Sequence, residues 1–172
     1  KKDQTAIIFT SQKAKINLII RALAKEKIKA MGVSSDIEQE QREETLRGFK
    51  NKNFNILVAT DVLSRGIDIN NLNLVVNFDV PRDPEDYIHR IGRTARAETT
   101  GISMTFINEV DQKKVLFIER LLEKEVEKQN ITEALGLGKA PEFRAVLRTG
   151  SPKPNNGGKK RFFRKKGPKP NS

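Results

Sequence analysis

The stretch NILVAT, residues 55–60, decides the fold class that the sequence predicts. It is an almost uninterrupted run of apolar residues, which is typical of a strand buried on both faces of a parallel sheet. Four more short runs have the same β-branched, apolar character, and we expect each of them to be a strand. They are TAIIFT (5–10), IKAMGV (28–33), LNLVVNF (72–78) and GISMTFI (101–107).

Segments with helical periodicity separate these runs. Residues 12–25 place Ile16, Ile19 and Leu23 on one face, with lysines opposite. Further helices are expected at 38–50, with Leu46 and Phe49 facing inward, from about Asp83, and from 110 to about 129. Strands and helices that alternate through short links predict an α/β protein with an open parallel sheet and helices on both faces.

The basic residues are unevenly distributed. The chain has 172 residues, with 33 Lys and Arg against 22 Asp and Glu, and a net charge of +11. Residues 151–172 contain eight basic residues and no acidic one, so the tail supplies most of the excess charge. We expect a folded domain at 1–135, a linker at 136–150 and a disordered basic tail at 151–172. A polyanion, either nucleic acid or an anionic membrane surface, is the natural partner of such a tail.

The composition disfavours several classes of function. The chain has no Cys, which excludes a disulfide framework, a thiolate metal site and a thiol nucleophile. With one histidine and no cysteine, we expect no zinc site. No apolar run approaches the roughly 20 residues that a membrane-spanning helix needs, so no membrane partner is expected for the domain.

Polar residues follow two of the expected strands, at the sheet edge where parallel sheets bind ligands. Residues 60–69, TDVLSRGIDI, combine a hydroxyl, two carboxylates, an arginine and a glycine that permits close backbone approach. An ordinary strand-to-helix loop accounts for the same residues equally well. Ser11, after the first strand, could donate to a phosphate or cap the next helix, and capping is the commoner role.

The segment YIHRIGRTAR, residues 87–96, contains the only histidine and the only tyrosine of the chain. Its arginines Arg90, Arg93 and Arg96 are three residues apart, which fans them over one broad side of a helix. Such a pattern taken alone is most simply a solvated basic face. The alternative is an anion clamp, because guanidinium groups match the geometry of phosphate oxygens.

Together, AIIFTSQ (6–12), ILVATDVLSRGIDI (56–69) and YIHRIGRTAR (87–96) resemble the last three motifs of the DEAD-box RNA helicases, in their second RecA-like domain. The segment DIEQEQR (36–42) adds the Gln39/Arg42 pair usual in that family. The resemblance covers about residues 5–107 strongly and the closing helix more loosely. Ser11-Gln12 departs from the Asn-Thr of many members, and Ala95 replaces a glycine.

The resemblance implies an ATP-dependent RNA helicase in which ATP binds between two RecA-like domains. Neither G-x-x-x-x-G-K-[ST] nor D-E-A-D occurs in this sequence. We therefore expect the second half only, inactive as a fragment, with the first RecA-like domain of the same chain as its partner. The resemblance assigns Mg²⁺ to that first domain.

The resemblance also implies roles for individual residues. Arg93 and Arg96 are the expected catalytic arginine fingers on the γ-phosphate, whereas Arg90 is expected to be structural. Asp68 would bind the ribose, with Arg65 and Gly66 lining the same cleft. At the domain interface, His89 would meet the first domain and Asp61 would orient arginines. The residues expected to contact the RNA backbone, without sequence readout, are Ser11, Gln39, Arg42, Thr60 and Gly92.

Two interpretations of the single residues and the tail remain open. His89 could instead be a satisfied interior histidine, and Tyr87 is expected to pack. The tail segment KKRFFRKK interleaves phenylalanines with cations, which favours RNA binding by phosphate neutralisation and base stacking over a solubilising basic end. The residues of this expected RNA contact are Lys159, Lys160, Arg161, Phe162, Phe163 and Arg164.

The expected function is ATP-driven unwinding of RNA duplexes. The alternative is a non-enzymatic RNA-binding or RNA-annealing protein that keeps the fold and uses the tail. A related translocase on DNA is disfavoured by the histidine at position 89. We expect a cytoplasmic protein from a bacterial source.

Overall fold

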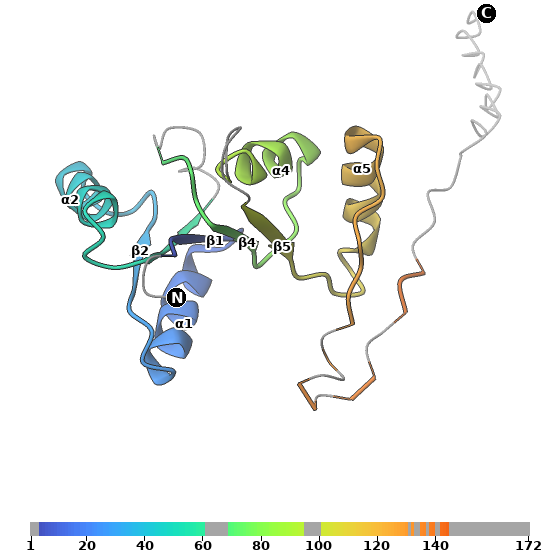
Figure 1. Ribbon diagram of the computed structural model, residues 1–172, viewed down its shortest axis with the longest axis horizontal. Coiled ribbons are helices and arrows are strands. Elements are labelled where there is room, and N and C mark those ends of the chain that lie inside the picture. Colours follow the sequence, from blue (N-terminus) through green and yellow to red (C-terminus); the bar gives the residue numbers. More distant parts are fainter. Residues whose placement is uncertain are drawn as a thin grey trace, which may run out of the picture.

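The computed structural model describes residues 4–60, 69–94, 101–130, 132, 135–136, 138–139 and 142–144. Over these residues, five strands form one parallel sheet in the order β2-β3-β1-β4-β5 (Figure 1). The strands are β1 (Ala6–Thr10), β2 (Ala30–Val33), β3 (Ile56–Thr60), β4 (Leu74–Asn77) and β5 (Ile102–Thr105). The helices are α1 (Lys13–Lys25), α2 (Gln39–Lys50), α4 (Pro84–Ile91) and α5 (Gln112–Leu122). Each expected strand is present, within two residues at either end.

The helices lie on both faces of the sheet, as predicted. Figure 1 shows α1 on one side of the strands and α2 and α4 on the other. On the α1 side, Ile16 and Ile19 pack against Ile8 of the central strand β1 and Val58 of its neighbour β3. On the opposite side, Phe49 of α2 belongs to a second cluster with the alternate residues of the same strands. The core therefore has two layers, because side chains of a strand alternate between its faces.

The closing helix is shorter than the sequence predicts. We expected it to continue to about residue 129, but α5 ends at Leu122 and Glu123 adopts a left-handed backbone with φ 51°. The buried Glu119 carboxylate accepts hydrogen bonds from the Val126 backbone (2.9 Å) and from Lys128 Nζ (2.5 Å). These bonds turn the chain back along α5 (Figure 1), although the helical periodicity of the sequence continues.

The segment after α5 also contacts the beginning of that helix. The Gln112 side chain donates to the Glu142 carbonyl (2.9 Å) and accepts from the Arg144 backbone N–H (2.9 Å). Phe143, between them, packs against a cluster formed by α4 and α5 that includes Tyr87, which is buried as expected. Residues 142–144 are thus part of the packed structure.

The outer strand β5 is covered much less than the other strands. Ile102 pairs with Leu74 and Met104 pairs with Val76, so these two residues lie on the face of the sheet that α1 covers elsewhere. Ile102 is 62% exposed and Met104 is 44% exposed. The apolar layer on this face therefore continues beyond the area that α1 covers. No helix in the described ranges is long and apolar enough to cross a membrane.

Candidate functional site

The carboxyl ends of β1 and β3 place two threonines side by side. Thr10 pairs with Thr60 in the sheet, and both residues are buried. The Thr60 hydroxyl oxygen has no hydrogen-bond partner among the described residues. Buried polar atoms are almost always paired, so an unpaired hydroxyl at a strand end indicates a place where a ligand could supply the partner. Ser11, the next residue after Thr10, is exposed.

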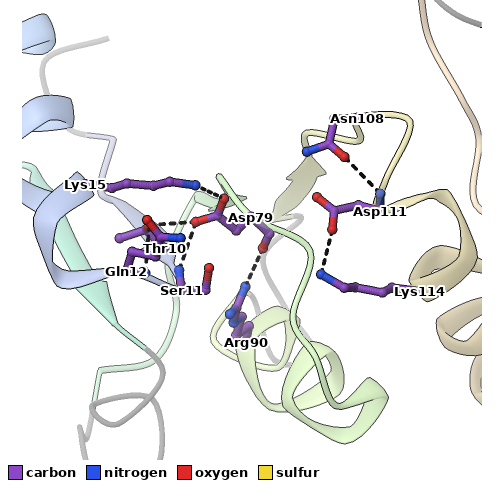
Figure 2. Close-up of polar contacts among 9 residues, drawn as sticks. All are labelled: Thr10, Ser11, Gln12, Lys15, Asp79, Arg90, Asn108, Asp111 and Lys114. Atoms are coloured by element: carbon purple, nitrogen blue, oxygen red, sulfur yellow. Dashed lines mark hydrogen bonds and ion pairs between the residues drawn. The ribbon is translucent and has the colours of Figure 1, made fainter.

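Asp79 lies just beyond the carboxyl end of β4 and connects it to β1 and α1 (Figure 2). One carboxylate oxygen, Oδ2, accepts from the Thr10 hydroxyl (2.7 Å) and from the Ser11 backbone N–H (2.9 Å). The other, Oδ1, accepts from Lys15 Nζ (2.5 Å). Burial by itself raises the pKa of Asp79. The hydrogen bonds from Lys15, Thr10 and Ser11 outweigh burial and lower the pKa from 3.8 to about 2.

Arg90 is a buried structural residue, as the family resemblance led us to expect. Its side chain is fully buried and lies over the Phe9 ring, with 5.2 Å from the guanidinium carbon to the ring centroid. It donates to Asn77 Oδ1 (2.9 Å) and to the Asp79 carbonyl (3.0 Å). A guanidinium with several donors in one plane can therefore tie α4 to both β1 and β4.

Helix α4 carries the remaining residues of the arginine segment. Its N-cap is Asp83, whose side chain accepts from the Glu85 backbone N–H, and Pro84 opens the first turn. His89 is exposed, which excludes the interpretation as an interior histidine. Arg93, just after the helix, is partly exposed, and its carbonyl accepts from the Leu72 backbone N–H.

The structure separates the predicted site into two regions. Asp83 lies after the carboxyl end of β4, whereas Arg93 meets Leu72, which precedes β4. The eight residues of α4 account for about 12 Å between these positions. Ser11 and Thr60 therefore share the carboxyl edge, while Gly92 and Arg93 lie at the far end of α4 and are not brought to that edge.

Helix α2 starts on the carboxyl side of the sheet, because it follows the end of β2. Gln39 is exposed in its first turn and its amide donates to Glu43 (2.6 Å). Arg42, one turn later, is partly exposed. Both predicted RNA-contacting residues of this helix are thus accessible at the same side as Ser11 and Thr60.

Residues 1–98 match the family model described as the helicase conserved C-terminal domain. The chain belongs to this family. Within it, the chain is a C-terminal domain of the DEAD-box type, as two solved relatives show. A DEAD-box protein from Methanococcus jannaschii is 41% identical, with a TM-score of 0.68 over 73% of this chain and 34% of that one. The E. coli DEAD-box protein SrmB, solved with the regulator of ribonuclease activity A (RraA), is 30% identical. The match has a TM-score of 0.74 and covers 82% of this chain and 83% of that one.

A curated relative gives the same result from sequence. The ATP-dependent rRNA helicase RRP3 of Encephalitozoon cuniculi is 42% identical over 123 residues. The match covers 72% of this chain and 31% of that protein. The chain thus spans about a third of the length of this relative and of the Methanococcus protein.

Several predicted site residues of this helicase C-terminal domain lie outside the described residues. Among the expected nucleotide and interface residues, these are Asp61, Arg65, Gly66, Asp68 and Arg96. The expected RNA contacts of the tail, from Lys159 to Arg164, are also outside the described ranges. In the described part of the chain, no group of three or more His, Cys, Asp or Glu residues could hold a metal ion.

Sequence reasoning missed Asp79, which makes more polar contacts at the carboxyl edge than Ser11 or Thr60. One signal was present: Asp79 follows the expected strand at 72–78 and precedes Val80-Pro81, so it is a carboxylate at a strand end. Its partners lie 64 to 69 positions earlier in the sequence. Only the pairing of β4 with β1 brings them together.

Proposed function

We propose that this domain is the second RecA-like half of an ATP-dependent RNA helicase. The proposal is supported by the similarity to an enzyme named as an ATP-dependent rRNA helicase, of which the chain spans about a third. The observation that carries it is the anchoring of α4. The buried Arg90 holds this helix to β1 and β4, so that the partly exposed Arg93 is carried on a rigid support.

The nucleotide side of the proposal concerns Arg93 and Arg96. Hydrolysis of the terminal phosphoryl group develops charge on its oxygens, and a cation held in place stabilises that charge without reorganisation. Fixing α4 through Arg90 supplies this preorganisation for Arg93. We assign ribose binding to Asp68 and the lining of the same cleft to Arg65 and Gly66. His89, exposed on α4, is assigned to the interface with the first RecA-like domain, as is Asp61, and that domain would hold Mg²⁺.

The RNA side of the proposal concerns the carboxyl edge of the sheet. The Thr60 hydroxyl, which has no partner in the part of the chain that the structure describes, is suited to a phosphate oxygen or a ribose 2′-hydroxyl. Ser11 and the α2 residues Gln39 and Arg42 are accessible at the same side. Groups of this kind contact the sugar-phosphate backbone, which carries no sequence information. Gly92, at the end of α4, is assigned to RNA on the family resemblance alone.

The test is RNA-stimulated ATP hydrolysis by the native full-length protein. Arg93→Ala should lower the rate by about 10³-fold or more, as for arginine fingers generally. The matched control is Arg120→Ala, which removes an exposed arginine of α5 and should leave the rate unchanged. Hydrolysis that survives Arg93→Ala would contradict the assignment. A native protein that anneals RNA without hydrolysing ATP would favour the non-enzymatic alternative.

We further propose that the basic tail tethers the domain to RNA and that the protein works in the cytoplasm. The tail residues proposed to contact RNA are Lys159, Lys160, Arg161, Phe162, Phe163 and Arg164. Phosphate neutralisation by the tail should give a steep dependence of RNA affinity on salt. Equal RNA affinities at low salt for proteins ending at residues 150 and 172 would contradict the tether, and cell fractionation tests the location.

A further inference from the structure

Asp79 uses both oxygens of its carboxylate on the segment that joins β1 to α1. Two donors, the Thr10 hydroxyl and the Ser11 backbone N–H, share Oδ2, and Lys15 binds Oδ1. These partners cover the last residue of β1, the loop after it and the first turn of α1. Figure 2 shows the three groups converging on the one side chain. A single carboxylate thus fixes the path of the chain at this strand end.

The start of α1 depends on the same contact. The N-cap residue of α1, Gln12, makes no side-chain capping bond, and the first turn of the helix contains no acidic residue. Instead, the Thr10 hydroxyl oxygen accepts from the Gln12 backbone N–H (3.4 Å) while its proton is donated to Asp79. The conformation of residues 10–12 is therefore set through Asp79 rather than by a local cap.

The negative charge of Asp79 is unfavourable for RNA binding at this edge. A carboxylate beside an edge that meets RNA phosphates repels the ligand, so electrostatics alone would favour a neutral residue here. The side chain of Asp79 is 14% exposed, and Lys15 offsets its charge. The cost to RNA affinity is compensated only if the carboxylate does something for the strand end that a neutral residue cannot do.

We propose that Asp79 is a positioning residue that holds Thr10 and Ser11 in the conformation that binds the RNA backbone. The inference rests on the proposed function, since it assigns a support to an RNA-facing strand end. It also gives the side chain and the backbone carbonyl of Asp79 different roles. The side chain serves the RNA edge, while the backbone carbonyl accepts from Arg90, which anchors the helix proposed to carry the nucleotide-binding Arg93. A side-chain substitution should therefore change RNA binding and leave nucleotide binding unchanged.

The first experiment measures RNA affinity after Asp79→Asn, because the two effects of the carboxylate predict opposite changes. Loss of the negative charge alone would strengthen RNA binding, whereas loss of the positioning contacts would weaken it. In the native full-length protein, we expect Asp79→Asn to weaken binding of single-stranded oligouridine RNA about tenfold, because an amide cannot accept at both positions. The KM for ATP should stay the same. Asp83→Asn is the matched control, since it removes one carboxylate from the same connection and asparagine is an equally good N-cap. It should bind RNA as the wild type does, or slightly more tightly.

A second pair of variants tests the same contact from the other side. Thr10→Ser keeps the hydroxyl that donates to Asp79 and should retain RNA affinity, whereas Thr10→Val removes it and should weaken binding in the same way as Asp79→Asn. Unchanged or tighter RNA binding by both Asp79→Asn and Thr10→Val would overturn the inference. Equal losses of RNA and ATP affinity would also overturn it, because they indicate general destabilisation. A wild-type protein that binds no RNA would instead refute the proposed function itself.

Discussion

The carboxyl end of β1 and helix α4 are each held in place by a charged side chain, but the two charges have opposite signs. At β1, a carboxylate receives donors from the backbone, a hydroxyl and a lysine. At α4, a guanidinium donates to an amide oxygen and a carbonyl. Unpaired N–H donors gather at the start of a helix, where Asp79 lies beside α1, whereas the acceptors around Arg90 are the Asn77 amide oxygen and the Asp79 carbonyl, so each support has the sign that its surroundings can satisfy. The two supports meet at Asp79, one through the side chain and the other through the backbone.

The largest expected effect on stability comes from removing the Arg90 contacts that hold α4. Arg90→Ala should lower the free energy of unfolding by about 3–5 kcal/mol, because it leaves buried acceptors on Asn77 and Asp79 without their donor. The measurement is chemical denaturation followed by circular dichroism. Arg82→Ala removes an exposed arginine two residues before α4 begins and should stay within about 0.5 kcal/mol of the wild type. A loss below about 1 kcal/mol for Arg90→Ala would show that α4 is held by its apolar contacts.

The next largest effect concerns the pH dependence of the stability that Asp79 contributes at the end of β1. The pKa of Asp79 is lowered to about 2, so its stabilisation is present above pH 3.8 and is lost as the pH falls towards 2. The shift corresponds to about 2 kcal/mol. Asp79→Asn should therefore reduce stability at neutral pH and flatten the acid dependence between about pH 4 and pH 2.

Thermal unfolding across this pH range measures the effect. Asp36→Asn is the control, since the ion pair between Asp36 and Lys13 is exposed and should contribute little. If Asp79→Asn kept the full acid dependence of the wild type, the carboxylate at β1 would not be the group that titrates.

The smallest effect concerns the first turn of α4. Asp83→Ala removes the side-chain cap on the Glu85 N–H and should cost about 1 kcal/mol, whereas Asp83→Ser should recover most of it. Denaturant midpoints of the three proteins make the comparison. Equal midpoints for Asp83→Ala and the wild type would mean that the Asp83 side chain does not stabilise the first turn of α4.

The strands and the packed faces of the helices could be read from the sequence because they depend on local periodicity. The run at 55–60 predicts a buried strand, and β3 is buried at Leu57, Val58 and Ala59. The end of α5 could not be predicted, since its amphipathic pattern continues past Leu122 and the helix stops where Glu119 binds the returning chain.

The arginines of the candidate site also could not be assigned from local sequence pattern alone. Equal spacing suggested equal roles for Arg90, Arg93 and Arg96, and only the family resemblance separated them. Burial then distinguishes Arg90, which is fully enclosed, from Arg93, which is partly exposed. Spacing along a helix gives the direction of a side chain, but what it meets there depends on neighbouring strands.

By itself, the sequence determined the α/β class, the five strands, the family and the segments that carry its motifs. These follow from side-chain periodicity and from residue order, which are properties of neighbours along the chain. Tertiary structure alone decided that β4 lies beside β1 and that Asp79 reaches Thr10 across 69 positions. It also decided that Arg93 lies away from the carboxyl edge. Contacts between distant segments depend on strand order and register, and local patterns do not encode either of them.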